Sequence, residues 1–349
     1  MGACVMKNLS VFPTPVLPGL HNLLSRYAES MTWMARYMER IENLARLIEV
    51  TGTFVRPRNG HAGWESLLQI NADEDRFHAI HEEASEHAVV GFYITERDNP
   101  GSIAGMAHGV RENARALRPL ISTEMWMHLN VFTQWVRDLT PRDVRAGSLS
   151  GICTRLKQEC QTHFGITEGT LYRDQAWLFY VLGKYLERAD QITRLLDIKY
   201  HILLPRGVDV GSDIDTSQWT SVLRSAAAYH AFRRVLPSGM TPVNIVGFLL
   251  KNDGFPRSLS TSLRQVHSAL GLLSGEYRLR HSSHILERVE ELRVTLAEQT
   301  AEEIIGRGLH EYMEWMQCQL RQIQEEIMQA FWPAVPVPVS VAMPGGQVQ

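Results

Sequence analysis

The sequence of 349 residues lacks a basic cluster, a long apolar run and a paired-cysteine motif, and each absence removes a class of protein. Its formal net charge is −3, so the electrostatic footprint of a nucleic-acid-binding protein is missing. The longest apolar run, Ala176 to Gly183, is too short to cross a bilayer. The cysteines form no CxxC pair, so we expect reduced thiols in a cytoplasmic protein.

Motifs that mark common catalytic and nucleotide-binding sites are missing as well. The chain contains no Walker loop, no G-x-S-x-G elbow, no H-E-x-x-H and no glycine fingerprint. We therefore expect no ATP binding by this chain alone and no cofactor. The densest ligand-like run extends from His78 to His87, but it contains no Glu-x-x-His and few apolar residues. We interpret this run as a solvated face and predict no metal site.

Apolar residues recur at helical spacing almost throughout the chain. Between Trp33 and Ile48 they form a wide stripe with a period of 3.6 residues. Similar patterns predict helices over Ser102–Leu117, Thr123–Leu139, Leu149–Phe164, Asp174–Leu204, Ser217–Leu236, Pro242–Leu250, Ser258–Leu273 and His284–Phe331, the last broken near Gly306 and Gly308. No stretch alternates as a half-buried strand does. The sequence therefore predicts an all-α protein.

Proline marks several predicted boundaries. Asn99-Pro100 and Thr241-Pro242 each place a capping residue before a proline, which suits the first position of a helix. Residues 333–349 are rich in proline and are predicted to form a disordered tail. Residues 1–22 are predicted to be a poorly ordered N-terminal extension.

Two segments of the chain are nearly the same. YMERIENLARLI begins at Tyr37 and YLERADQITRLL begins at Tyr185, an offset of 148 positions. Two later landmarks repeat in the same order: Trp64 recurs as Trp219, and a Val-Gly-Phe triplet recurs at offset 156. We therefore predict an internally duplicated helical bundle of two homologous halves, residues 23–169 and residues 170–332.

The charges in the repeated segment allow three interpretations, and the first is a solvated helix face. Glu42 with Arg46 and Asp190 with Arg194 are i,i+4 pairs with the acid first, the favourable order on a helix. Arg36 with Glu39 and Lys184 with Glu187 are i,i+3 pairs. On a solvated face each pair would contribute roughly 0.3–0.5 kcal/mol.

The second interpretation is a buried structural network. Arg40 and Arg188 lie at the edge of the apolar stripe, where a guanidinium needs a carboxylate partner. Pairing across a pseudo-twofold axis would join Glu39 to Arg188 and Glu187 to Arg40. The third interpretation assigns these same four residues to catalysis or ligand binding.

Arginines elsewhere are candidates for binding an anion. Arg111 and Arg115 are four residues apart and would present parallel forks to one anion. Arg173 precedes the second repeat, and Arg257 lies at a predicted helix start, where free N–H groups suit phosphate or carboxylate. The alternative for each residue is helix capping or an interhelical ion pair. Only convergence of these side chains in one cleft would favour a site.

Taken together, these segments resemble the bacterial alpha-E family, a helical domain with a Glu-Arg motif. The resemblance rests on Ser25–Val50, Asp98–Leu117, Ser122–Asn130, Leu171–Pro205, Trp219–Arg234 and Phe255–Leu259. Similar family members are typically encoded beside, or fused to, a circularly permuted ATP-grasp protein and a transglutaminase-like cysteine peptidase. The resemblance implies a part in a peptide-forming or protein-modifying system, with the ATP-grasp partner forming the amide bond.

Two functions follow as expectations. The first is a non-catalytic helical partner, or substrate-presenting module, of the ATP-grasp amide ligase, with no nucleic acid and no membrane involved. The second is an enzyme that binds a carboxylate- or phosphate-bearing substrate in an Arg/Glu-lined groove between the halves. Glu39 or Glu187 would then act as general acid or base. We expect the first, and co-purification with the ATP-grasp protein distinguishes the two.

Overall fold

The computed structural model describes residues 23–54, 60–145, 147–203, 213–277 and 283–333, which form helices joined by turns and loops without a strand. The predicted all-α class is confirmed. The helices of the first part of the chain are α1 (Ser25–Phe54), α2 (Gly60–Asn71), α3 (Glu74–His78), α4 (Glu86–Ile94), α5 (Ile103–Ala116), α6 (Thr123–Asp138) and α7 (Leu149–Thr170). Those of the second part are α8 (Gln175–Leu203), α9 (Asp213–Ser225), α10 (Tyr229–Val235), α11 (Pro242–Lys251), α12 (Leu259–Gly275), α13 (Ser283–Glu298), α14 (Ala301–Arg307) and α15 (Leu309–Phe331). The predicted extension at 1–22 and the tail from 334 lie outside the described residues.

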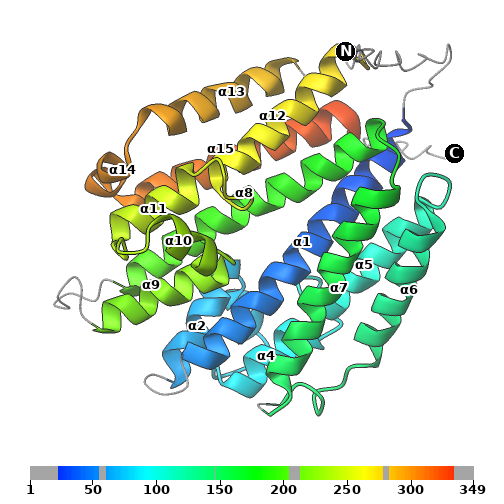
Figure 1. The fold of residues 1–349 in the computed structure, drawn as a ribbon. Helices are drawn as coiled ribbons and strands as arrows, with labels where there is room; N and C mark the ends of the chain where they lie inside the picture. Colours follow the sequence, from blue (N-terminus) through cyan, green and yellow to red (C-terminus); the bar gives the residue numbers. More distant parts are fainter. Residues whose placement is uncertain (1–22, 55–59, 146, 204–212, 278–282, 334–349) are drawn as a thin grey trace, which may run out of the picture.

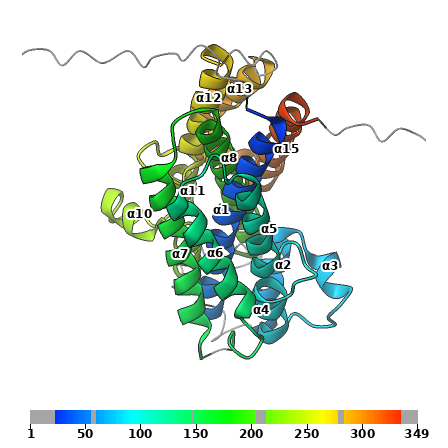
Figure 2. The same ribbon diagram turned by 90° about the vertical axis from the view of Figure 1, so that its right-hand side faces the viewer.

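Two long helices, α1 and α8, pack along each other at the centre of the molecule (Figure 1). Helices α5, α6 and α7 form a group with α1, and α12, α13 and α15 form a group with α8. The short helices lie toward the ends of these groups, and α3 and α10 project on opposite sides in the turned view of Figure 2. One continuous hydrophobic core joins both groups.

The apolar stripe predicted in the first repeat becomes the buried face of α1. Met34, Met38 and Ile41 are fully buried there, at the spacing that places them on one side of a helix. Helix ends are set by side-chain caps: Ser102 accepts a hydrogen bond from the amide of Gly105 at the start of α5. The central helices are therefore held mainly by burial and the shorter ones also by their caps.

A glycine sets how closely the two central helices approach. A Cβ atom on Gly183 of α8 would lie 2.2 Å from the carbonyl oxygen of Thr32 on α1, far inside van der Waals contact. The Thr32 hydroxyl also lies 3.4 Å from the carbonyl oxygen of Phe179. Only a residue without a side chain fits at position 183. The close crossing brings α1 and α8 together one turn before Glu187.

Two local features recur at the offset of the predicted duplication. Ala72 and Ala227, at offset 155, both have a positive φ, of 54° and 56°. Ser102 and Ser258, at offset 156, both cap the helix that follows. A duplication would produce these agreements, and superposition of the two halves is the test that remains for it.

Two predicted helices are divided, and both predictions were too long. The helix expected over Ser217–Leu236 is interrupted between α9 and α10, because Ala227 takes up the left-handed conformation. The helix expected over His284–Phe331 breaks at Gly308, as predicted, and also before Thr300, which caps α14 through a capping box with Glu303. Alanine in the left-handed region carries no sequence signal, so the first break could not be foreseen.

The two predicted proline boundaries have different outcomes. Thr241 caps α11 and Pro242 takes the first turn, as predicted. The prediction at Asn99-Pro100 was wrong, because α5 begins three residues later and Ser102 is its cap. The Asn99 side chain accepts a hydrogen bond from the Gly101 amide and donates one to the carbonyl of Phe92. This residue therefore closes a turn between α4 and α5.

Candidate functional site

The repeated Glu-Arg dipeptides face each other where α1 and α8 cross. Arg188 on α8 makes a two-pronged contact with Glu39 on α1, at 2.6 Å and 3.0 Å. Arg40 on α1 makes the same kind of contact with Glu187 on α8, at 2.5 Å and 2.9 Å. The cross-pairing predicted from the sequence is therefore present. Bidentate contacts of this kind fix geometry as well as adding energy.

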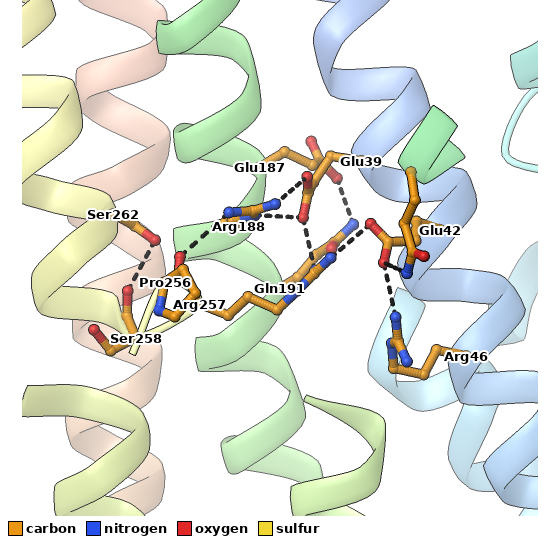
Figure 3. A network of polar contacts seen from close by, with 11 residues as sticks. Glu39, Glu42, Arg46, Glu187, Arg188, Gln191, Pro256, Arg257, Ser258 and Ser262 are labelled. Atoms are coloured by element: carbon orange, nitrogen blue, oxygen red, sulfur yellow. Dashed lines mark hydrogen bonds and ion pairs between the residues drawn. The ribbon is translucent and has the colours of Figure 1, made fainter. Parts of the chain in front are cut away.

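Glu39 belongs to a cluster that extends along α1 and reaches the start of α12 (Figure 3). Arg257, just before α12, donates to Glu39 at 2.8 Å and to Glu42 at 2.6 Å. Arg46 donates to the other oxygen of Glu42 at 2.7 Å. Both carboxylates are completely buried, and each accepts from two arginines. We call Glu39, Glu42, Arg46, Arg188 and Arg257 the Glu39 cluster.

Glu187 lies at the centre of a second group, which we call the Glu187 cluster. Besides Arg40, it accepts from the Nε of Arg36 at 2.9 Å and from the side-chain amide of Gln191 at 3.0 Å. The Glu187 side chain is 1% exposed, whereas that of Arg40 is 33% exposed. Water therefore reaches one edge of this cluster.

One acid in each cluster, Glu42 and Glu187, is held ionised. Burial would raise the pKa of Glu187, but Arg40 and Arg36 outweigh it and lower that pKa to about 2. Burial also opposes ionisation of Glu42, yet Arg257 and Arg46 lower its pKa to about 2. A general acid or base near neutral pH needs a pKa near 7. These two carboxylates are set for binding cations, not for transferring protons.

The local pairs expected within each helix are formed only in part. Glu42 with Arg46 and Asp190 with Arg194 form the predicted i,i+4 pairs. The predicted pair of Arg36 with Glu39 is wrong, because Arg36 crosses to Glu187. Lys184 makes no pair with Glu187, whose oxygens already accept from arginines on α1. Arginine–carboxylate contacts between helices thus replace two of the expected contacts along one helix.

The four candidate anion-binding arginines do not converge. Arg111 and Arg115 both contact Glu112 between them, and Arg111 also donates to Asn130. Arg173 donates to the carboxylate of Glu168 at 2.6 Å and stacks on the ring of Trp177. Of the four, Arg257 alone joins the Glu-Arg dipeptides. The anions that it binds are carboxylates of the protein itself, which matches the alternative of an interhelical ion pair.

The histidine-rich run forms no ligand set within the described structure. Helix α3 ends at His78, so His78 and Glu82 do not lie on one helix face. His78 contacts Glu65 at 3.2 Å and is 41% exposed. Across the described residues, no three His, Cys, Asp or Glu side chains gather as a metal site would need.

A cavity of about 470 Å³ lies at the Arg46 end of the Glu39 cluster, where Glu49 and Arg224 also line it. The space beside Arg188 and Arg257 is much smaller. A cavity of about 20 Å³ reaches Arg188, Arg257 and Asn43. That is room for about one water molecule. In chemical terms the arrangement fixes α1, α8 and the start of α12 to one another, with each acid supplied with donors from the protein.

Sequence reasoning missed the role of Arg257 in joining Glu39 to Glu42. The repeat itself held the only available signal: position 257 is arginine where the corresponding position of the first half is Gly101. A side chain present in one copy and absent from the other marks a point where the two halves differ.

The segment that contains both clusters matches a known protein family. The model of the Alpha-E family, described as a predicted alpha-helical domain with a conserved ER motif, matches residues 23–332. Both Glu-Arg dipeptides of the two clusters lie within that range. In the described residues, no helix is long and apolar enough to span a membrane.

Curated relatives match with lower coverage. The uncharacterised proteins Mb2597 of Mycobacterium bovis and Rv2567 of Mycobacterium tuberculosis are each 23% identical over 194 residues, covering 49% of this chain. The matched segment is 22% of the length of those relatives. No solved structure matches.

Proposed function

The chain belongs to the Alpha-E family, and we propose that it is a non-catalytic helical partner of an ATP-grasp amide-ligase system. Its task in this proposal is to dock on the ligase or to present the ligase's substrate, in peptide synthesis or protein modification. The partners are a circularly permuted ATP-grasp protein and a transglutaminase-like protein. The buried free thiols Cys153 and Cys160 support a cytoplasmic location.

One observation carries the non-catalytic part of the proposal: the acids of the Glu-Arg dipeptides are fully used inside the protein. Glu39 and Glu187 are 0% and 1% exposed and accept from arginines of the opposite helix. A catalytic acid or base must reach its substrate within hydrogen-bond distance. These carboxylates reach guanidinium groups instead, so the motif supports a role in fixing the helices.

The mycobacterial relatives support a role as a module. In them, the segment that resembles this chain makes up 22% of a longer polypeptide. A helical unit that occurs together with other chain segments has a surface available for docking on them. The resemblance to alpha-E members encoded beside ATP-grasp proteins supports an ATP-grasp protein as the partner.

The alternative, an enzyme with an Arg/Glu-lined groove between the halves, has less support. The cavity beside Arg188 and Arg257 holds about 20 Å³, whereas ligand sites usually hold roughly 300–1,000 Å³. A cavity of about 470 Å³ does lie between the halves, lined by Arg46 and Arg224 among others, but neither Glu39 nor Glu187 lines it. Enlarging the space beside Glu39 and Glu187, the proposed acid or base, would require breaking the contacts of both clusters.

Co-purification tests the proposal. The tagged chain is expressed with the circularly permuted ATP-grasp protein of the same genome, and the complex is isolated by size exclusion. We expect a stable complex whose ATP hydrolysis depends on the ATP-grasp chain. Hydrolysis of ATP by this chain alone, or its failure to form the complex, would contradict the proposal. Arg115→Ala, an exposed change away from both clusters, serves as a control variant that should still form the complex.

A further inference from the structure

Another cavity lies between α7, α8 and α12, apart from the Glu-Arg clusters. Its volume is about 260 Å³. The walls include Phe164 of α7, Trp177 and Tyr185 of α8, and Leu272 of α12. Three aromatic rings and an aliphatic side chain form the apolar part of this wall, beside polar side chains, and small-molecule sites combine the two in this way.

A lysine without a counter-ion lies in this cavity. The Nζ of Lys184 is 4.4 Å from the centre of the Phe164 ring and 5.6 Å from that of Tyr185. Within the described part of the chain, it forms neither a hydrogen bond nor an ion pair. By contrast, Lys157 pairs with Glu49, and Lys251 donates to backbone carbonyls.

The repeat explains why Lys184 is left without a partner. It corresponds to Arg36 at offset 148, and Arg36 pairs with Glu187. The carboxylate that corresponds to Glu187 is Glu39, whose oxygens are taken by Arg188 and Arg257. Because Arg257 has no counterpart in the first half, only the lysine of the second half loses its acid.

The charges around Lys184 favour an incoming anion. Burial lowers the pKa of Lys184 first, and Arg188 lowers it further, to about 8, against the opposing effects of Glu39 and Glu42. Glu168 lines the same cavity, but it already binds Arg173. Every acid near this amine is therefore matched to an arginine.

Neutral hydrogen-bonding groups are also available at the cavity. Gln265 and Ser268 line it, and their side chains make no hydrogen bond to another described residue. A bound oxygen anion would thus meet an ammonium group and uncharged polar groups together.

We propose that this cavity binds a small organic acid, whose carboxylate contacts Lys184 while its apolar body lies against Phe164, Trp177 and Tyr185. A single ammonium group balances the single charge of a carboxylate, whereas a phosphate dianion would leave one charge unmatched. The volume is suited to a ligand about the size of an amino acid. This binding needs no partner protein, so it stands independently of the amide-ligase proposal.

Calorimetry on the full chain tests the site with three probes: phenylacetate, N-acetylphenylalanine and the neutral phenylacetamide. We expect both acids to bind at millimolar concentration and the amide to bind at least about tenfold more weakly, because it lacks the charge-assisted contact. Tighter binding of N-acetylphenylalanine would identify a peptide C-terminus as the natural form of the acid. Tighter binding of phenylacetate would identify a free small acid.

Three variants locate the binding. Lys184→Met should lower the affinity for both acids at least about tenfold and leave the affinity for the amide unchanged. Leu272→Trp narrows the cavity at a residue that is 39% exposed and keeps all charges. It should lower the affinity for all three probes. Lys251→Met removes a lysine charge away from the cavity and should leave the affinity for all three probes unchanged.

Results of two kinds would show that the cavity does not bind an acid through Lys184, and a third would contradict the choice of a carboxylate. One is that neither acid binds, or that the acids and the amide bind with equal affinity. The other is unchanged affinity for the acids in a folded Lys184→Met variant. Benzylphosphonate that binds where the carboxylates do not would also contradict the carboxylate assignment.

Discussion

Replacing Arg188 by alanine tests whether the Glu39 cluster stabilises the fold. The change removes both contacts to Glu39 and the 3.2 Å hydrogen bond to the carbonyl of Pro256. Glu39 would stay buried, with Arg257 as its remaining partner. Breaking a buried pair from one side costs roughly 3–5 kcal/mol, and the remaining arginine places the expected loss near 3 kcal/mol.

That free energy converts into a measurable shift in melting temperature. The unfolding entropy is about 2.1 cal/mol/K per residue, or about 0.65 kcal/mol/K for the roughly 310 residues of the domain. A loss of about 3 kcal/mol then lowers Tm by about 5 °C in a cooperative transition. Arg40→Ala should cost less, about 1–2 kcal/mol, because its side chain is 33% exposed and Glu187 keeps Arg36.

Differential scanning calorimetry at neutral pH measures both variants. The matched control is Arg115→Ala, whose side chain is 68% exposed and whose pair with Glu112 lies on the surface. Such pairs contribute about 0–1 kcal/mol, so its Tm should stay within about 1–2 °C of the parent. The reasoning is refuted if Arg188→Ala melts together with this control.

Three further predictions concern other positions. Because the pKa of Glu187 is lowered to about 2, its contribution to stability is complete above the unfolded value near 4.5 and is lost as pH falls from about 5 to 2. Urea unfolding across this range should show that the free energy of unfolding depends less steeply on pH in Glu187→Gln than in the parent. Gly183→Ala should lower the free energy of unfolding by at least about 1–3 kcal/mol, since its Cβ would clash with Thr32, and a neutral result in urea unfolding would disprove the close approach. Burial raises the pKa of the Cys160 thiol well above its usual value, so Ellman's reagent should label exposed Cys318 while Cys160 stays unreactive until the protein unfolds.

The helices and the cross-pairing could be predicted because both depend on patterns within one segment. The stripe from Trp33 to Ile48 identifies the buried face of α1, and the repeated dipeptide, placed at the edge of that stripe, requires acid partners. The prediction that Glu39 pairs with Arg188 needed only these two facts and a symmetric arrangement of the copies.

The remaining features depend on contacts between distant segments, which local patterns do not encode. Arg257 reaches Glu39 only because the loop before α12 packs against α1. Arg36 pairs with Glu187 of the opposite helix at 2.9 Å, while Glu39 pairs with Arg188 and Arg257. The isolated charge of Lys184 is a consequence of both arrangements.

The central claim is that the Glu-Arg dipeptides hold α1 and α8 together and do not act on a substrate. A double-mutant cycle across Glu39 and Arg188, with Glu39→Gln and Arg188→Met alone and combined, measures their coupling directly. Capture of the ATP-grasp partner is measured on the same samples. The account predicts a coupling of at least about 1.5 kcal/mol, with partner capture falling only in proportion to the unfolded fraction. A coupling below about 0.5 kcal/mol, in variants that stay folded yet fail to capture the partner, would contradict it.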